Sequence, residues 1–312
     1  MKRKFYVFLP LVITGLVLVS CSAAPSEVVV AEQTAEISLV DGLGRTVTLS
    51  NPATSVVSLS PSNTELLYAV GAGNTMVGRD SFSDYPEEVI DLPDIGGGYS
   101  EYNLEMLIEL DPDLVLAAEI NTAELVQSIE DLGITVFYIS NPVVLDDLYA
   151  TIEQVGVLTG KEETAQLLIE QSKQRVETVV DAISQVENTP VVFYELDATD
   201  PTKPYTPGPD TFYSTLISMA GGKNLGDALS ASWAQISLEE LVLQDPDLIL
   251  LGDAMWGITA ESVGEREGWS TLTAVQQGNV LPFDDNLLAR PGPRLIDGLE
   301  ALAQVIHPEV FK

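Results

Sequence analysis

The side chains that most often carry catalysis or hold a soft metal ion are scarce in this chain. Its 312 residues include one histidine, His307, and one cysteine, Cys21. Ser-His-Asp or Cys-His catalysis and zinc or copper sites all draw on these residues, and zinc sites use several of them. The sequence contains no phosphate loop of the form G-x-x-x-x-G-K-[ST]. We therefore expect a protein that is not an enzyme and has no cofactor or metal of its own. Paired carboxylates leave a hydrolase open as an alternative.

The cysteine follows a segment with the plan of an export signal. The charged start Met1–Lys4 precedes an apolar run over residues 5–19, which is too short for a comfortable membrane span. The run ends in Leu18–Cys21, which resembles the bacterial lipobox, where cleavage frees the cysteine amine and lipid is attached to its thiol. We expect a signal peptide over residues 1–20, lipidation of Cys21 and a tether over residues 21–36. An ordinary signal peptide with an incidental cysteine is the alternative.

Composition excludes some classes of partner. The chain has 14 Lys+Arg against 47 Asp+Glu, a formal net charge of −33. Nucleic-acid binding needs a basic face, so we expect no nucleic-acid partner. Attraction to anionic lipid is equally disfavoured, which leaves the N-terminal lipid as the expected membrane contact. Hydrophobic residues make up 46% of the chain, enough for a packed core.

One stretch of the chain occurs twice in similar form. Residues 103–117 (NLEMLIELDPDLVLA) and 237–251 (SLEELVLQDPDLILL) are identical at eight of 15 positions, whereas composition alone predicts about one match. Each copy predicts a capped helix, an Asp-Pro stop and a buried strand. Glu105 and Glu239 occupy the same position in the first helical turn, where the helix dipole stabilises an anion. A solvated helix end explains each glutamate without any function.

The repeat predicts two lobes of the same architecture. Apolar runs at residues 56–59 and 191–194 begin the two copies, and each is followed by a helix with a glycine-rich end. We predict an α/β fold of two Rossmann-like lobes with mostly parallel sheets, over residues 37–159 and 189–312. A hairpin is expected at the start of the first lobe, at residues 37–49.

A long helix is expected between the lobes. Residues 161–186 contain neither glycine nor proline, and their apolar positions follow the helical period. A helix of this length spans about 39 Å at 1.5 Å per residue. We predict that the segment 160–188 is a stiff strut that joins the lobes.

Several segments resemble one family of transport proteins. Residues 57–66 (VSLSPSNTEL) resemble the opening of the cobalamin- and ferric-siderophore-binding proteins of ABC importers. Residues 83–86 (SDYP), 112–115 (PDLV) and 289–294 (ARPGPR) add to the resemblance, which covers roughly residues 52–308 and is nearest to the cobalamin binder. The resemblance implies two lobes joined by one long helix, with the ligand in the cleft between them.

The expected ligand-binding residues come from two sources. Parallel sheets bind ligands beyond the carboxyl ends of their strands, which favours Ser60, Pro61, Ser62 and Asn63. The resemblance places aromatic side chains against a corrin ring at Phe82, Tyr99, Tyr205 and Trp233. To these we add Trp256, which follows the second repeated strand, and Arg290 in the segment 289–294. Packing within a lobe is the alternative for each aromatic residue, and for Trp269 it is the expectation.

A corrinoid, cobalamin or cobinamide, is the first choice of ligand. Ferric catecholate siderophores are anionic and usually meet clustered arginines, whereas plausible cleft segments hold only Arg79, Arg290 and Arg294. Arg290 and Arg294 are alternatively expected to brace the C-terminal lobe. Haem also remains a possible ligand, because a tyrosine can ligate its iron. The one histidine, His307, is expected to pack at the surface and not to ligate haem. A ferric siderophore or haem therefore remains the alternative ligand. A surface hydrolase or a structural lipoprotein is a less favoured alternative function.

The resemblance also implies a partner for the repeated glutamates. In that family the pair equivalent to Glu105 and Glu239 docks onto arginines of a homodimeric permease, which offers two equivalent surfaces. We expect a lipid-anchored, extracytoplasmic monomer that delivers its ligand to an ABC permease dimer with its ATPase.

Overall fold

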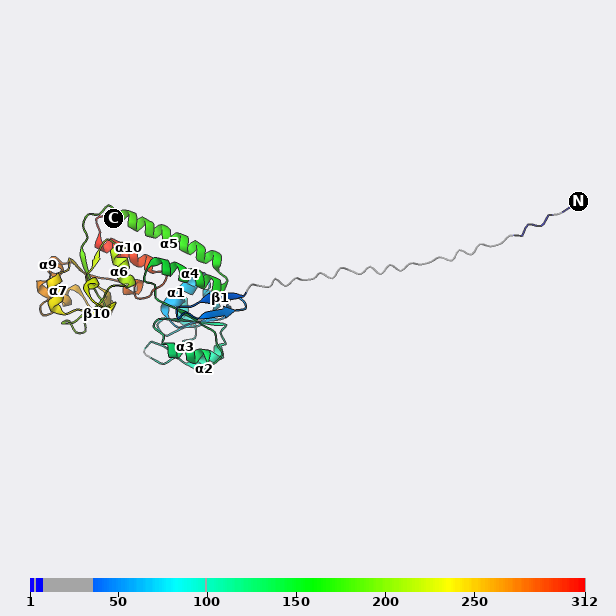
Figure 1. Cartoon of the computed structure of the whole chain (residues 1–312), viewed down its shortest axis with the longest axis horizontal. Helices are drawn as coiled ribbons and strands as arrows, with labels where there is room; N and C mark the ends of the chain where they lie inside the picture. Colours follow the sequence, from blue (N-terminus) through cyan, green and yellow to red (C-terminus); the bar gives the residue numbers. More distant parts are fainter. Residues whose placement is uncertain (3, 8–35, 99, 312) are drawn as a thin grey trace. The chain divides into compact units, whose positions relative to one another are not determined.

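The computed structural model describes residues 1, 2, 4–7, 36–98 and 100–311 (Figure 1). The chain divides into two units, Met1–Thr34 and Ala35–Lys312. In the first, residues 1, 2 and 4–7 carry no regular secondary structure. None of the helices in the described ranges has the length and apolar character of a membrane span. Cys21 lies outside the described residues, as does the predicted tether up to residue 35.

The N-terminal lobe is built on a four-stranded parallel sheet in the order β4-β3-β5-β6. Its strands are Val56–Ser58 (β3), Met76–Gly78 (β4), Leu114–Ala118 (β5) and Val136–Ile139 (β6). Its helices are Pro61–Ala69 (α1), Leu104–Leu110 (α2), Ala123–Glu130 (α3) and Leu145–Thr159 (α4). The expected hairpin is formed by Ile37–Val40 (β1) and Thr46–Leu49 (β2). All residues of β5 and β6 are buried, which explains why they read as continuous apolar runs.

The C-terminal lobe repeats this plan with the parallel order β12-β11-β7-β9. Its strands are Val191–Glu195 (β7), Lys223–Asn224 (β9), Leu248–Leu251 (β11) and Val280–Pro282 (β12). Its helices are Phe212–Met219 (α6), Leu238–Gln244 (α7), Ala260–Gly264 (α8), Thr273–Gln277 (α9) and Leu295–Ile306 (α10). The sequence did not predict an antiparallel ribbon of Tyr205–Pro207 (β8) with Trp233–Gln235 (β10).

Short 3₁₀ helices occupy several connections between these elements. They are Gly73–Thr75 (η1), Glu87–Asp91 (η2), Leu225–Ala228 (η3), Gly252–Trp256 (η4), Trp269–Thr271 (η5) and Asp285–Leu287 (η6). Of these, η4 follows β11, one of the two central strands of its sheet, and η6 precedes the segment 289–294.

The two copies of the repeat adopt the same local structure. Helices α2 and α7 begin with side-chain caps from Asn103 and Ser237, as predicted. Both helices end at an aspartate in the left-handed region, Asp111 at φ 43° and Asp245 at φ 42°. The following proline cannot continue the helix, so the chain turns directly into the buried strand.

One hydrophobic core cluster contains residues of both lobes, and each lobe has a further cluster of its own. Glu162–Ile183 (α5) is slightly shorter at each end than the predicted strut and spans about 33 Å. Buried Ile169 and Val179 on α5 belong to the same core cluster as Leu66 of α1 and Leu299 of α10. Figure 1 shows α5 running alongside α4 and α10. Arg175 of α5 also pairs with two acids of α10, at 2.5 and 2.6 Å. The strut is therefore packed against both lobes along its length.

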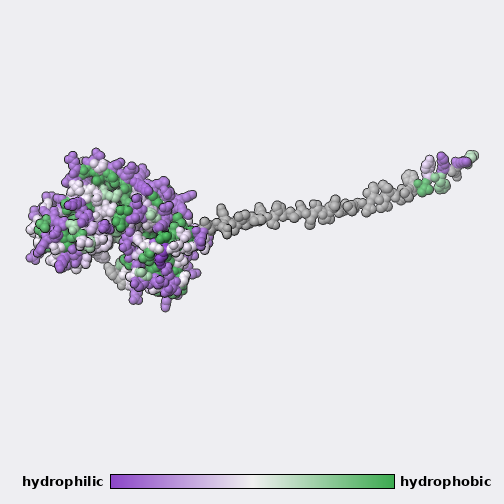
Figure 2. Space-filling view, viewed as in Figure 1, coloured by the Kyte–Doolittle hydropathy of each residue, from purple (hydrophilic) through white to green (hydrophobic). Residues whose placement is uncertain are grey.

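The structure confirms the expectation for Trp269 and contradicts the one for His307. Trp269 is fully buried and its indole N–H donates to the carbonyl of Pro201 at 3.0 Å, so it packs the lobe as predicted. The prediction that His307 packs at the surface is wrong. The residue is only 1% exposed, and its Nε2 lies 3.2 Å from the carbonyl oxygen of Gly221. Hydrophilic residues predominate on the face of the folded unit that Figure 2 shows, in line with the acidic composition.

Candidate functional site

A cleft of about 590 Å³ lies between loops of the two lobes. Its N-terminal wall comes from the loops after β3, β4 and β5, and its C-terminal wall from β10, η4 and the segment around residue 290. Its aromatic side chains are Phe82, Tyr102, Trp233 and Trp256, and Leu59, Ile120 and Met255 add aliphatic or thioether surface. Three of the aromatic side chains are well exposed, Phe82 at 40%, Trp233 at 49% and Trp256 at 73%. Exposed aromatic rings gathered in one concave site indicate a ligand-binding surface.

The cleft brings together most, but not all, of the expected ligand-binding residues. Those that line it are Ser60, Pro61, Ser62, Phe82, Trp233, Trp256 and Arg290. Two are not among the lining residues: Asn63, which is fully buried, and Tyr205, which is 45% exposed elsewhere. Tyr99 lies outside the described residues.

The loop after β3 is fixed by helix capping. Ser60 has extended backbone angles (φ −157°, ψ 151°), and its hydroxyl accepts the N–H of Asn63 at 3.3 Å. Pro61 suits the first helical turn because that position needs no N–H donor. Ser60 and Ser62 hydroxyls lie 3.1 Å apart in the cleft wall. The cap turns the chain so that Ser60–Ser62 face the ligand side while Asn63 enters the interior. Among the described residues, neither polar atom of the Asn63 side chain has a hydrogen-bond partner.

Tyr102, which the sequence analysis missed, is held rigidly in the cleft wall. Its hydroxyl donates to the carbonyl of Leu59 at 3.1 Å and accepts from the Asn121 amide at 2.8 Å. Asn121 is itself fixed, because its side-chain oxygen accepts the N–H of Ala118 at 2.7 Å. Burial, with a smaller effect from the charge of Asp80, raises the pKa of Tyr102 to about 12. Tyr102 is therefore a neutral phenol. Its position before the helix start at Asn103 was the available signal.

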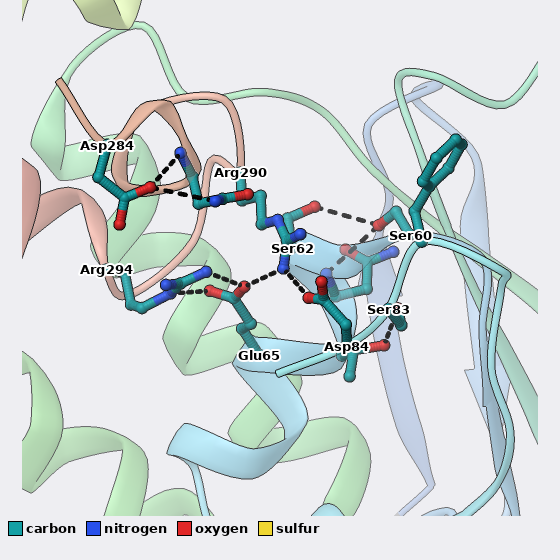
Figure 3. A network of polar contacts seen from close by, with 12 residues as sticks. Ser60, Ser62, Glu65, Ser83, Asp84, Asp284, Arg290 and Arg294 are labelled. Carbon is teal, nitrogen blue, oxygen red and sulfur yellow. Dashed lines mark hydrogen bonds and ion pairs between the residues drawn. The ribbon is translucent and has the colours of Figure 1, made fainter. Parts of the chain in front are cut away.

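Four charged side chains form an interlobe clamp at one side of the cleft: Glu65 and Asp84 from the N-terminal lobe, and Arg290 and Arg294 from the C-terminal lobe (Figure 3). Arg294 donates twice to Glu65, at 2.6 and 2.7 Å. Arg290 lies 2.5 Å from Asp84 and 3.3 Å from Glu65. The hydrogen bond from Arg290 holds the pKa of Asp84 below its usual value. The expectation that these arginines brace the C-terminal lobe is therefore corrected: they join the two lobes.

The aromatic residues of the C-terminal wall are positioned by short elements. Trp233 lies in β10, opposite Pro207 of β8, and its ring packs edge-on against Phe212 and Tyr213 at centroid distances of 6.1 and 5.6 Å. Trp256 is the last residue of η4, directly after β11. Both rings are therefore presented from the carboxyl side of the C-terminal sheet, where the strand order predicts a ligand site.

The repeated glutamates lie outside the cleft. Glu105 and Glu239 are exposed in the first turns of α2 and α7, and within the described ranges neither forms an ion pair. They occupy equivalent places in two lobes of the same topology, and their role in docking stays a prediction.

A metal site is not evident in the cleft. Within the described part of the chain, no group of three or more His, Cys, Asp or Glu side chains is arranged to hold a metal ion. The cleft is instead an apolar, aromatic surface with a few fixed polar groups, which is the usual composition of a small-molecule site.

The chain is similar to known binding proteins over most of its length. A family model described as periplasmic binding protein matches residues 56–287. YvrC from Bacillus subtilis (strain 168), an uncharacterised ABC transporter substrate-binding lipoprotein, is 33% identical over 321 residues and covers 100% of both chains. A cobalamin-binding protein of Halobacterium salinarum is 29% identical over 274 residues, covering 86% of this chain and 73% of the relative.

Solved structures with the same fold carry different ligand descriptions. A possible iron-binding (periplasmic solute-binding) protein from Staphylococcus epidermidis matches with a TM-score of 0.72 at 29% identity, over 82% of this chain and 100% of that one. The vitamin B12-binding protein of Vibrio cholerae matches at 0.71 and 25%, over 82% and 98%. The haem-binding protein RhuT from Roseiflexus matches at 0.70 and 25%, over 83% and 99%.

Proposed function

This chain belongs to the periplasmic binding protein family, and on that premise we propose that it is the extracytoplasmic substrate-binding component of an ABC importer for a corrinoid. It captures cobalamin or cobinamide in the interlobe cleft and delivers it to the permease. The observation that carries this proposal is the cleft itself, with exposed aromatic rings on both walls. A corrin presents a broad, largely apolar ring with carboxamide arms, which suits such a surface. The cobalamin-binding relative at 29% identity supports the same ligand class.

Haem and ferric siderophores form the second candidate, because solved structures of the same fold include haem-binding and possible iron-binding proteins. Two features of the cleft weigh against them. A tyrosine must lose its proton to ligate iron well, and the raised pKa of Tyr102 opposes that. Anionic siderophores favour clustered arginines, whereas Arg290 is the one Lys or Arg among the described lining residues and is already paired.

The N-terminus provides the membrane attachment in this proposal. Export followed by lipidation of Cys21 gives a protein anchored outside the cell membrane, and the relative YvrC, a lipoprotein that aligns over the whole chain, supports this arrangement. The acidic composition argues against a nucleic-acid partner or a direct contact with anionic lipid. The protein acts as a monomer that reaches a permease dimer, with its ATPase, through Glu105 and Glu239.

The cleft acts in binding and not in catalysis. Isothermal titration of the purified protein with cyanocobalamin, cobinamide, haem and a ferric siderophore tests the proposal. We expect tight one-to-one binding of the corrinoids, with the ligand recovered unchanged. Tight binding of haem or siderophore alone would support the second candidate function, binding of haem or a ferric siderophore. Ligand turnover would instead favour a hydrolase, and binding of none of the four would favour a structural lipoprotein.

A further inference from the structure

The arginines of the folded unit already have acidic partners. Each arginine among the described residues 36–311 lies in an ion pair with Asp or Glu: Arg45, Arg79, Arg175, Arg266, Arg290 and Arg294. In the same part of the chain, no lysine lines the cleft. A ligand that enters the cleft therefore meets no free cationic side chain from the described residues.

The acids of the cleft are not balanced in the same way. Three carboxylates, Asp80, Asp84 and Glu119, line it together with the single guanidinium of Arg290. Asp84 and Arg290 neutralise each other at 2.5 Å. Asp80 is buried and accepts from the hydroxyl of Ser83 and from a backbone N–H, and its burial raises its pKa. Glu119 is an exposed carboxylate, and none of the described residues forms an ion pair with it.

Glu119 is held in place by the fold. It follows the last residue of β5, one of the two central strands of the N-terminal sheet. One carboxylate oxygen, Oε2, accepts the backbone N–H of Asn141, another cleft residue, at 2.9 Å. That bond ties the loop after β5 to the loop after β6. The carboxylate is therefore a fixed negative charge in the wall of a concave, largely apolar cleft, where charges act more strongly than on an open surface in bulk water.

We propose that Glu119 makes the cleft selective for the charge of its ligand, so that it prefers corrinoids of zero or positive net charge over anionic chelates of the same size. The inference rests on the proposed function and refines it. Carboxamide arms satisfy such a wall through their N–H donors, whereas a free carboxylate or catecholate would face Glu119 with like charge. Corrinoids with a cationic cobalt centre gain attraction from the same carboxylate.

A matched series of three corrinoids tests the charge preference. Cyanocobalamin is neutral; aquacobalamin, in slightly acidic buffer, carries one positive charge; and a cyanocobalamin monocarboxylate, with one carboxamide hydrolysed, carries one negative charge. We expect the wild-type Kd to rise in the order aquacobalamin, cyanocobalamin, monocarboxylate, with about a tenfold difference between the two ends. Equal affinity for all three would overturn the charge preference and leave the corrinoid proposal intact. Failure of all three to bind would overturn the proposed function and this inference with it.

The variant Glu119→Gln assigns the preference to one residue. Glutamine keeps an oxygen that can accept the Asn141 N–H, so the loops stay tied while the charge is removed. We expect the ratio of Kd values between monocarboxylate and aquacobalamin to fall several-fold, with little change for cyanocobalamin. The control Glu124→Gln removes an exposed charge in the first turn of α3, outside the cleft lining, and should keep the wild-type ratio. An unchanged ratio in Glu119→Gln, or an equal fall in both variants, would contradict the role of Glu119.

Discussion

At the scale of single residues, the most perturbed acid outside the cleft is Asp253, the second residue of η4. It is 6% exposed and lies near the buried ion pair between Glu195 and Arg266, whose closest atoms are 2.6 Å apart. Burial, followed by the charge of Glu195, raises the pKa of Asp253 to about 7. The same short helix η4 carries the cleft residues Met255 and Trp256.

The shift predicts a pH dependence of stability with a definite sign. The unfolded chain releases the Asp253 proton near pH 3.8, whereas the folded protein keeps it until about pH 7. The folded state therefore binds more protons in that window, and this contribution to stability falls as the pH rises through it. We expect Asp253→Asn to gain on the order of 1 kcal/mol relative to wild type between pH 5 and pH 8, after allowance for solvent screening. Urea unfolding at both pH values measures it, and a constant difference would contradict it.

Sequence reasoning reached some cleft residues and missed others for physical reasons. Phe82 and Trp233 were found by resemblance, and Ser60–Ser62 by their place after a strand. Tyr205 was expected beside them, but its strand β8 has three residues, too short for alternation to indicate which side chain faces the cleft. Glu119 was not singled out, because a lone acid in a loop is typical of solvated surface, and the one signal for Tyr102 was its position before the helix cap Asn103.

At the scale of elements, the sequence was most informative where a pattern repeats. The 15-residue repeat and the glycine-free stretch predicted α2, α7 and the strut α5, because caps, Asp-Pro stops and helical periodicity are local signals. The ribbon of β8 and β10 joins strands about 25 residues apart in the chain, so no local pattern indicated it. The clamp between α1 and the segment after η6 was hidden for the same reason: its members Glu65 and Arg294 are 229 positions apart.

The clamp predicts a large effect of one buried acid on stability. Glu65 is 4% exposed and accepts from both arginines, so its replacement leaves Arg294 without its partner. We expect Glu65→Gln to lower the free energy of unfolding by about 3 kcal/mol, as for a buried pair broken on one side. Glu300→Gln is the matched control: it weakens the half-exposed pair with Arg175 and should cost less than about 1 kcal/mol.

Urea denaturation of the two variants checks this difference. Equal losses would mean that the clamp acts as an ordinary surface pair. A loss confined to Glu65→Gln would support a clamp that holds the two lobes together beside the cleft.

At the scale of the whole molecule, two lobes share one core cluster and carry equivalent helices at their surfaces. The core cluster that includes α5 draws residues from both lobes, which favours a stiff body with limited closure around its ligand. The helices α2 and α7 carry Glu105 and Glu239 in equivalent positions, as a partner with two equivalent surfaces requires. The fold and its two-lobe plan could be predicted from the sequence. The charge balance of the cleft could not, because it depends on which acids meet which arginines.

The proposed docking role predicts a loss of transport without a loss of binding. Replacement of both Glu105 and Glu239 by lysine should abolish corrinoid uptake by cells and leave the Kd for cyanocobalamin within about twofold, because the residues lie outside the cleft. The control Glu124→Lys with Glu261→Lys changes the net charge equally, at exposed first-turn positions with one in each lobe. Its uptake should stay near the wild-type level. A weakened Kd in the first pair would contradict a docking role.

The central claim is that a corrinoid binds between the aromatic walls of the interlobe cleft, and titration of cyanocobalamin into the wild type and into Trp233→Ala tests it most directly. Trp233 is half exposed in the cleft, whereas Leu243, at 77% exposure on α7, lies outside it and provides the control Leu243→Ala. We predict one-to-one binding to the wild type, a Kd at least about tenfold weaker in Trp233→Ala, and no change in Leu243→Ala. Absence of binding to the wild type, or an unchanged Kd in Trp233→Ala, would contradict the claim.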